Sequence, residues 1–143
     1  MTVGIDTDFL VGLSILEHPK HQVSVRIRDH HLDRGDRFAI APQVIAEFVH
    51  VVTDGKRFER PLLMEEALRR SQEWWNATEI DQIFPDGDAM AWFHDRMSGC
   101  QLGRKRILDT LLAATCLSAG VSHLITGNPS DYRIFPELEL IEL

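Results

Sequence analysis

Short apolar runs alternate along this chain with longer segments in which apolar residues recur at helical spacing. The short runs predict strands at residues 2–6, 37–41, 77–83, 121–126 and 138–143. The longer segments predict helices at residues 7–16, 19–31, 42–52, 61–75, 86–97 and 107–119. Because the two kinds of segment alternate, the pattern favours an α/β fold with a mostly parallel sheet.

Proline and glycine mark several of the predicted helix boundaries. Pro19, Pro42 and Pro61 suit the first turns of three helices, where a backbone amide has no intrahelical partner to lose. Asp54 and Gly55 stop the helix that begins at Pro42. The next helix follows after a short polar stretch, so we expect these two helices to form a hairpin.

The bulk composition limits the class of protein. With 143 residues, 44% of them hydrophobic and 26% charged, we expect one domain over residues 1–143 with an ordinary core. No charged-then-apolar leader and no apolar run of about 18 residues is present, so we expect no signal peptide and no membrane span. Cys100 and Cys116 lack metal-binding spacing and are expected to be reduced thiols of a cytoplasmic protein. The net charge of −7 argues against broad attraction to nucleic acid, but it leaves room for a metal and a local basic patch.

Three acidic residues lie in apolar surroundings that packing alone does not explain. Asp6 ends the first strand, Glu47 lies within VIAEFVHVV, and Asp109 lies within ILDTLLAATCL. A carboxylate costs several kcal/mol to desolvate unless it is paired, hydrogen-bonded or bound to a cation. Three of them in one place would also repel one another, and a divalent metal would remove that conflict. The sequence therefore predicts a small acidic pocket for Mg²⁺ or Mn²⁺.

Each acid also has a purely structural interpretation. Asp6 could cap the helix that follows it, because Asp is favoured at that position. Glu47 has apolar neighbours one turn away and is not expected on a simple solvent-exposed stripe, although an exposed helix edge shared with His50 is the alternative. Asp109 could cap its helix or pair with Arg106 three residues earlier.

A second polar group follows the strand at residues 121–126. Asn128 and Asp131 come just after this strand, at the sheet edge where Asp6 is expected. By itself, the segment is typical of an Asx turn. Its position matters because polar groups at the carboxyl ends of parallel strands converge on one cleft.

The basic residues and histidines give weaker signals. One dense basic cluster precedes Asp109 and could contact phosphates, or it could be a solvated loop; it consists of Arg104, Lys105 and Arg106. Four histidines flank the second predicted helix without zinc-binding spacing, and we expect them to be solvated: His18, His21, His30 and His31.

Taken together, these motifs resemble the PIN-domain ribonucleases, and most closely the toxins of VapBC-type toxin–antitoxin pairs. The resemblance covers nearly the whole chain through the opening VGIDTDFLVG, the VIAEFVHV helix, the segment RILDTLLAATCLSAGVSHLITGNPSDY and the overall length. The last segment is the most specific one. The resemblance implies a three-layer α/β/α sandwich with a central five-stranded sheet and an acidic metal cleft.

The resemblance also implies which residues form the site. By position, the first three acids of the family fall on Asp6, Glu47 and Asp109. The fourth falls on Asn128, where the family more commonly has Asp. Either Asp131 substitutes for it, or Asn128 coordinates through its carbonyl oxygen, and the occupancy of a second metal site is open.

The implied activity is metal-dependent endonucleolytic cleavage of single-stranded RNA. Asp6 and Asp109 would hold Mg²⁺ or Mn²⁺, Glu47 would orient or deprotonate the attacking water, and Asp8 would be an outer-shell ligand. RNA would be contacted by the basic cluster at residues 104–106. The family further implies a homodimer and an antitoxin segment that occupies the cleft, with contacts expected on the helices at 42–52 and 61–75.

Two other function classes share parts of this pattern. Asp6-x-Asp8 after an apolar strand is also the opening of HAD-like phosphatases, which need a later lysine and a following pair of acids. No Asp-Asp pair follows the last of the lysines, which are Lys20, Lys56 and Lys105. Phosphomonoester hydrolysis that is lost in Asp6→Asn would support this class. The non-enzymatic alternative is a degenerate PIN fold used as a binding module, which Asn128 favours and the intact acidic trio opposes.

Overall fold

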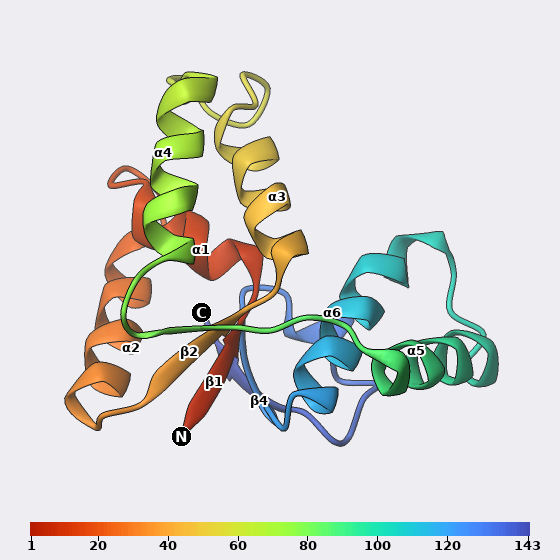
Figure 1. Cartoon of the computed structure of the whole chain (residues 1–143). Coiled ribbons are helices and arrows are strands. Elements are labelled where there is room, and N and C mark those ends of the chain that lie inside the picture. The colour runs from red at the N-terminus through yellow and green to blue at the C-terminus, as the bar shows by residue number, and fades with distance from the viewer.

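The computed structural model describes residues 1–143 and arranges them around a five-stranded sheet (Figure 1). The strands are β1 (Thr2–Ile5), β2 (Arg37–Ile40), β3 (Ile80–Gln82), β4 (His123–Thr126) and β5 (Glu139–Glu142). The helices are α1 (Thr7–Ser14), α2 (His21–Asp33), α3 (Pro42–Val52), α4 (Met64–Trp75), α5 (Gly87–Gly99) and α6 (Ile107–Ser118). Two short 3₁₀ turns, η1 (Arg104–Arg106) and η2 (Pro129–Asp131), complete the chain.

The sheet has the strand order β3-β2-β1-β4-β5, and all four pairings are parallel. The predicted α/β class with a mostly parallel sheet is confirmed. The central strand β1 is fully enclosed, since Val3 and Ile5 are buried. Gly4 lets α6 pack closely against this strand, because a Cβ there would lie 2.9 Å from the Cys116 sulfur. The order changes direction at β1, so the loops that follow β1 and β4 separate there and leave room for a site.

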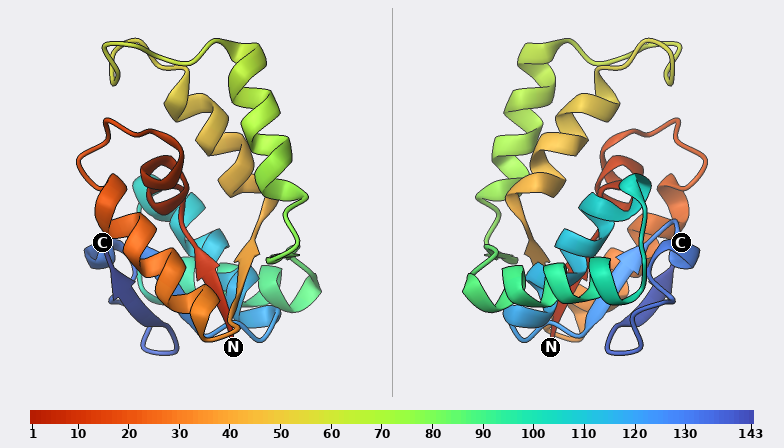
Figure 2. Two further views of the ribbon diagram at one scale, coloured as in Figure 1. Left: turned by 90° about the vertical axis from the view of Figure 1, so that its left-hand side faces the viewer. Right: turned by 90° about the vertical axis from the view of Figure 1, so that its right-hand side faces the viewer.

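The helices cover both faces of the sheet, which gives the expected three layers (Figures 1 and 2). α1 and α2 lie on one face, and α5 and α6 pack together on the other. The predicted hairpin is formed by α3 and α4, and it projects beyond the carboxyl ends of the strands. None of these helices has the length and apolar character needed to cross a membrane.

The helix starts at two prolines differ from the prediction. α2 begins at His21 rather than at Pro19, and α4 begins at Met64 rather than at Pro61. Before α4 the chain stays extended, because the Leu62 amide donates to the Val52 carbonyl at the end of α3, 2.8 Å away. This hydrogen bond between two elements competes with helix formation at Pro61, which proline preference alone does not predict.

The histidine prediction is wrong at one position. His31 is only 6% exposed, and its Nδ1 lies 2.8 Å from the Asp36 carboxylate. Asp36 also accepts a hydrogen bond from the amino group of Met1, and these contacts lower its pKa to about 2. The cluster lies at the amino ends of the strands, away from the carboxyl edge, so it forms part of the scaffold.

Candidate active site

Asp6 is the first residue after β1 and the most enclosed acid at the carboxyl edge of the sheet. Its backbone is extended, and its Oδ1 accepts from the Thr7 amide at 2.8 Å, so it caps α1 as one interpretation of the sequence proposed. Its Oδ2 accepts from the Thr126 hydroxyl at 2.8 Å and from the Tyr132 hydroxyl at 3.1 Å. Asp6 is only 8% exposed, and a capping role alone does not explain why this carboxylate is buried. Three donors, from β4, from α1 and from Tyr132 just after η2, fix its carboxylate.

Asp109 is brought to Asp6 by a shared tyrosine. The Tyr132 hydroxyl oxygen lies 3.3 Å from Asp109 Oδ1 as well as 3.1 Å from Asp6 Oδ2. A hydroxyl carries one proton and can donate to only one of the two carboxylates at a time. Asp109 neither caps α6 nor pairs with Arg106, which occupies the cap position itself. Both structural interpretations of Asp109 are therefore wrong.

Glu47 lies on α3 and is exposed to solvent, as are Ala46 and His50 beside it. The expectation that it would not lie on a simple exposed stripe is wrong. The reason is that α3 projects beyond the sheet and buries only one side, which carries Phe48. Glu47 is nevertheless tied to the site, because its Oε2 accepts from the Thr7 hydroxyl at 2.9 Å.

The turn after β4 contributes Asn128 and holds Asp8. The Asn128 side-chain amide donates to Asp8 Oδ2, which leaves the Asn128 carbonyl oxygen available to another ligand. Gly127 permits this approach, because a Cβ at that position would lie 2.9 Å from the same Asp8 oxygen. A larger residue there would force the turn away from α1.

Asp131 and the basic cluster are arranged differently from the expectation of free phosphate contacts. Arg106 donates to Asp131 Oδ1 at 3.0 Å and also to its backbone carbonyl. Arg106 is therefore paired with an acid of the protein itself, while Arg104 and Lys105 remain exposed on η1. Of the two residues considered for the fourth acidic position, Asp131 already has a cationic partner and Asn128 does not.

Burial and neighbouring negative charges disfavour the charged forms of the carboxyl groups at this edge of the sheet. Burial raises the pKa of Asp6, although hydrogen bonds from Thr126 and Thr7 partly offset the effect. Burial also raises the pKa of Asp8, and the Glu47 charge adds to the rise. For Asp109, burial together with the charges of Asp6 and Asp131 raises the pKa to about 6. Neither Asp6 nor Asp109 has an arginine or lysine partner that would relieve this repulsion.

The donor atoms fit a hard divalent cation. Asp6, Asp8, Glu47 and Asp109 offer only oxygen atoms, which are the ligands that Mg²⁺ and Mn²⁺ prefer. Hydrogen bonds to neighbouring side chains hold these groups, and no three of them converge closely enough to form a ready set of metal ligands. A cation that binds here would replace some of these hydrogen bonds and relieve the repulsion that raises the carboxyl pKa values.

Sequence reasoning missed Thr7, Thr126 and Tyr132, whose hydroxyl groups donate to the acids of the site. The signal at Tyr132 was an aromatic residue directly after Asp131, which packing explains equally well. Tyr132 is fully buried, and burial with the charges of Asp6 and Asp109 raises its pKa well above the usual value, so it stays protonated and remains a donor.

Comparisons with known proteins agree with this architecture. A family model described as the PIN domain matches residues 3–134 of the chain. The structure of VapBC2 from Rickettsia felis, bound to promoter DNA, aligns at a TM-score of 0.69 and 15% identity, over 100% of this chain and 99% of that one. VapBC-1 of nontypeable Haemophilus influenzae aligns at 0.70 and 15%, over 99% and 98%. VapC20 of Mycobacterium tuberculosis, a sarcin–ricin loop cleaving toxin, aligns at 0.63 and 13%, over 92% and 95%. No curated protein matches the chain.

Proposed function

Because this chain belongs to the PIN-domain family, we propose that it is a VapC-type toxin that cleaves single-stranded RNA as a metal-dependent endoribonuclease. The observation that carries the proposal is the pairing of two carboxyl groups, Asp6 and Asp109, on one buried hydroxyl. Repelling carboxylates at a sheet edge are costly for stability and have no packing role, whereas they are suited to bind a cation.

The proposed chemistry assigns a role to each side chain. Asp6 and Asp109 would hold the metal, with Asp8 and the Asn128 carbonyl oxygen beside them. When bound, Mg²⁺ or Mn²⁺ would supply Lewis-acid activation of the phosphate and lower the pKa of water. Glu47 uses Oε2 to accept from Thr7, so its other oxygen is free to accept a proton from the attacking water.

The remaining residues of the site orient the acids. The hydroxyls of Thr126 and Tyr132 fix the Asp6 carboxylate, so its direction is set before substrate arrives. Arg106 holds the turn that carries Asp131, and it thereby positions η2 next to α6. In this proposal Asp131 is a positioning residue, while the fourth oxygen comes from Asn128.

The decisive experiment measures cleavage of an unstructured RNA by the purified protein. We expect cleavage with Mg²⁺, none with EDTA, and a loss of at least about a hundredfold in Asp109→Asn, because one metal ligand and one charge are removed. Asp33→Asn is the matched control, since Asp33 is exposed at the end of α2. Equal cleavage in all of these reactions would eliminate the mechanism.

We also propose an antitoxin partner, a homodimer and a cytoplasmic location. The solved VapBC assemblies with the same fold support the antitoxin. Exposed apolar side chains at the start of α4, including Leu63 and Leu68, support a protein interface there. The free thiols of Cys100 and Cys116 suit a reducing compartment.

A binding module without catalysis is the second candidate, because Asn128 replaces the more common acid. The two candidates differ in their affinity for metal. Titration calorimetry that detects no Mg²⁺ or Mn²⁺ binding at millimolar concentration would favour the module over the nuclease. Binding that is lost in Asp6→Asn would favour the nuclease.

A further inference from the structure

A cavity of about 510 Å³ lies between the end of α1 and the α3–α4 connection. Its apolar wall includes Val11, Ile15, Val51 and Phe58. The volume is in the range of pockets that bind small organic molecules, about 300–1,000 Å³. The cavity therefore has the volume and the apolar wall to accept a small organic group.

The cavity is continuous with the acidic site through Asp8. This residue lines the cavity, and it also accepts the hydrogen bond from Asn128 at the end of β4. Asp8 is two residues from Asp6 on the first turn of α1. A group seated in the cavity would therefore be adjacent to a phosphate that reacts at the acids.

One side of the cavity carries positive charge. Arg57 and Arg60, on the α3–α4 connection, line it and are exposed. Arg57 has an ion pair with Asp54 at 3.4 Å, but the Arg57 side chain is 60% exposed, so this pair holds it weakly. Arg60 has no ion pair and Arg57 only this weak one, so both can offer positive charge to a phosphate beside the cavity, whereas Arg106 is already bonded to Asp131.

The cavity also contains an aromatic surface. Phe58 is half-buried against the core, and its ring centroid lies 6.5 Å from that of His18, with the planes tilted by 45°. Burial, with the charges of Lys20 and His21, lowers the pKa of His18, so this ring is neutral at pH 7. Stacking on an aromatic side chain is sequence-tolerant because every base has a π-face.

Acidic side chains also line the cavity, and they disfavour a phosphate group as its occupant. Glu17 and Glu59 are exposed at the cavity, and Asp8 lies inside it. A second phosphate would meet these carboxylates, whereas an amine on a base can donate to them. The chemistry thus fits a base in the cavity and its phosphate toward the arginines.

We propose that this cavity binds an unpaired nucleobase of the RNA strand beside the cleaved phosphodiester, with the base stacked on Phe58 and Arg57 and Arg60 neutralising the backbone. This inference rests on the proposed function, since it names how that substrate is held. It requires single-stranded RNA, because a paired and stacked base cannot enter the cavity.

The test measures binding separately from cleavage. Fluorescence anisotropy of a short unstructured RNA is recorded in EDTA with Asp109→Asn protein, because by the proposed mechanism cleavage needs the metal. Adding Phe58→Leu, which keeps apolar bulk but removes the ring, should weaken binding by about tenfold. Phe58→Tyr, which keeps the ring, should bind within about twofold. Arg57→Gln should weaken binding and reduce its salt slope by about one, while Arg69→Gln, on the exposed face of α4, should change neither.

The possible outcomes distinguish failure of the cavity proposal from failure of the proposed nuclease function. If the wild type does not cut RNA with Mg²⁺ but Phe58→Leu still loses RNA affinity, the proposed function fails and the assignment of the cavity as a base-binding site stands. If the wild type cuts RNA but Phe58→Leu and Arg57→Gln bind as tightly as the control, the cavity assignment is overturned. Loss of affinity for the antitoxin alone, with RNA binding unchanged, would also overturn it. Should Phe58→Leu not fold, Arg57→Gln decides, because Arg57 is exposed.

Discussion

Tyr132 shows how one side chain determines the state of two others. Its hydroxyl is the only contact that Asp6 and Asp109 have in common among the hydrogen bonds of the structure. Because the ring is fully buried, its position is set by packing, and the hydroxyl is then directed at the acids. At this scale Asp6 and Asp109 are held by neutral donors rather than by cations.

Removing that hydroxyl should destabilise the metal-free protein. Tyr132→Phe keeps the ring but leaves two acids with one donor fewer, so we expect the free energy of unfolding in EDTA to fall by about 1–3 kcal/mol. Urea unfolding measures the change. An unchanged free energy would show that the hydroxyl does not hold the acids, and cleavage should fall less than in Asp109→Asn, because both proposed ligands remain.

The stability of the metal-free protein should also fall as the pH rises toward neutrality. The pKa of Asp109 is about 6 when folded and 3.8 in a model peptide, so the folded state binds its proton more tightly. The stabilisation is complete below pH 3.8 and is lost as pH rises through about 6. Asp36 and Glu66, whose pKa is lowered to about 2 from 3.8 and 4.5, titrate below pH 5 and so contribute little to a change between pH 5 and pH 7.

Thermal melting in EDTA at pH 5 and pH 7 tests this prediction. The wild type should melt at a lower temperature at pH 7, and Asp109→Asn should reduce that difference and raise the pH 7 melting temperature. Mg²⁺ should restore the wild type at pH 7, because a ligand that binds only the folded state stabilises it. A metal-free wild type that is as stable at pH 7 as at pH 5 would contradict the prediction that the charged form of Asp109 destabilises the folded protein.

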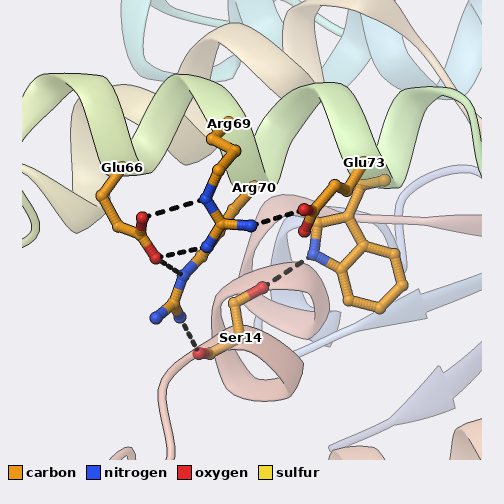
Figure 3. A network of polar contacts seen from close by, with 6 residues as sticks. Ser14, Glu66, Arg69, Arg70 and Glu73 are labelled. Atoms are coloured by element: carbon orange, nitrogen blue, oxygen red, sulfur yellow. Dashed lines mark hydrogen bonds and ion pairs between the residues drawn. The ribbon is translucent and has the colours of Figure 1, made fainter.

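At the scale of elements, a polar network links α4 to the end of α1 (Figure 3). Arg70 donates to the Ser14 carbonyl at the end of α1, 2.6 Å away, and to Glu66 one turn earlier. The Trp74 indole donates to the Ser14 hydroxyl at 2.8 Å. The contacts satisfy carbonyl and hydroxyl groups at a helix end, where the backbone lacks partners of its own.

This network makes a comparison of two adjacent arginines informative. Arg70→Met should lower the free energy of unfolding by about 1–3 kcal/mol, because a half-buried, charge-assisted hydrogen bond to a helix end is lost. Arg69→Met should change it by less than about 1 kcal/mol, since its pairs with Glu66 and Glu73 are solvent-exposed. Urea unfolding of both variants checks the difference. Equal losses would contradict the role given to the Ser14 contact.

At the scale of the whole molecule, the proposed interface at the start of α4 predicts self-association. Leu68 is 52% exposed there, and charge at that position should weaken a dimer. Light scattering at micromolar concentration should give a dimer for the wild type and a smaller species for Leu68→Glu. Leu32→Glu on α2 is the matched control and should leave the dimer intact. A monomeric wild type at high micromolar concentration would contradict the proposal.

The local pattern of hydrophobic and polar residues was sufficient to predict the strands and helices. Alternating strand and helix segments predicted all five strands and six helices, with errors at their ends, as at Pro19 and Pro61. Hydrophobic periodicity specifies which side of an element is buried, and this is a property of neighbouring residues. The helix start predicted at Pro61 failed because the Leu62 amide bonds to the Val52 carbonyl of the preceding helix, a contact between two elements that the local pattern does not contain.

The sequence predicted some residues of the candidate site, and only the tertiary structure showed how they are arranged. Sequence position alone identified Asp6, Glu47 and Asp109 as acids in unusual surroundings. Only the tertiary structure placed Glu47 in solvent, engaged Arg106 with Asp131, and directed Tyr132 at two acids. The physical reason is range: burial patterns repeat over a few neighbouring residues, whereas a carboxylate's partners and pKa depend on groups that the fold brings within about 4 Å from anywhere in the chain.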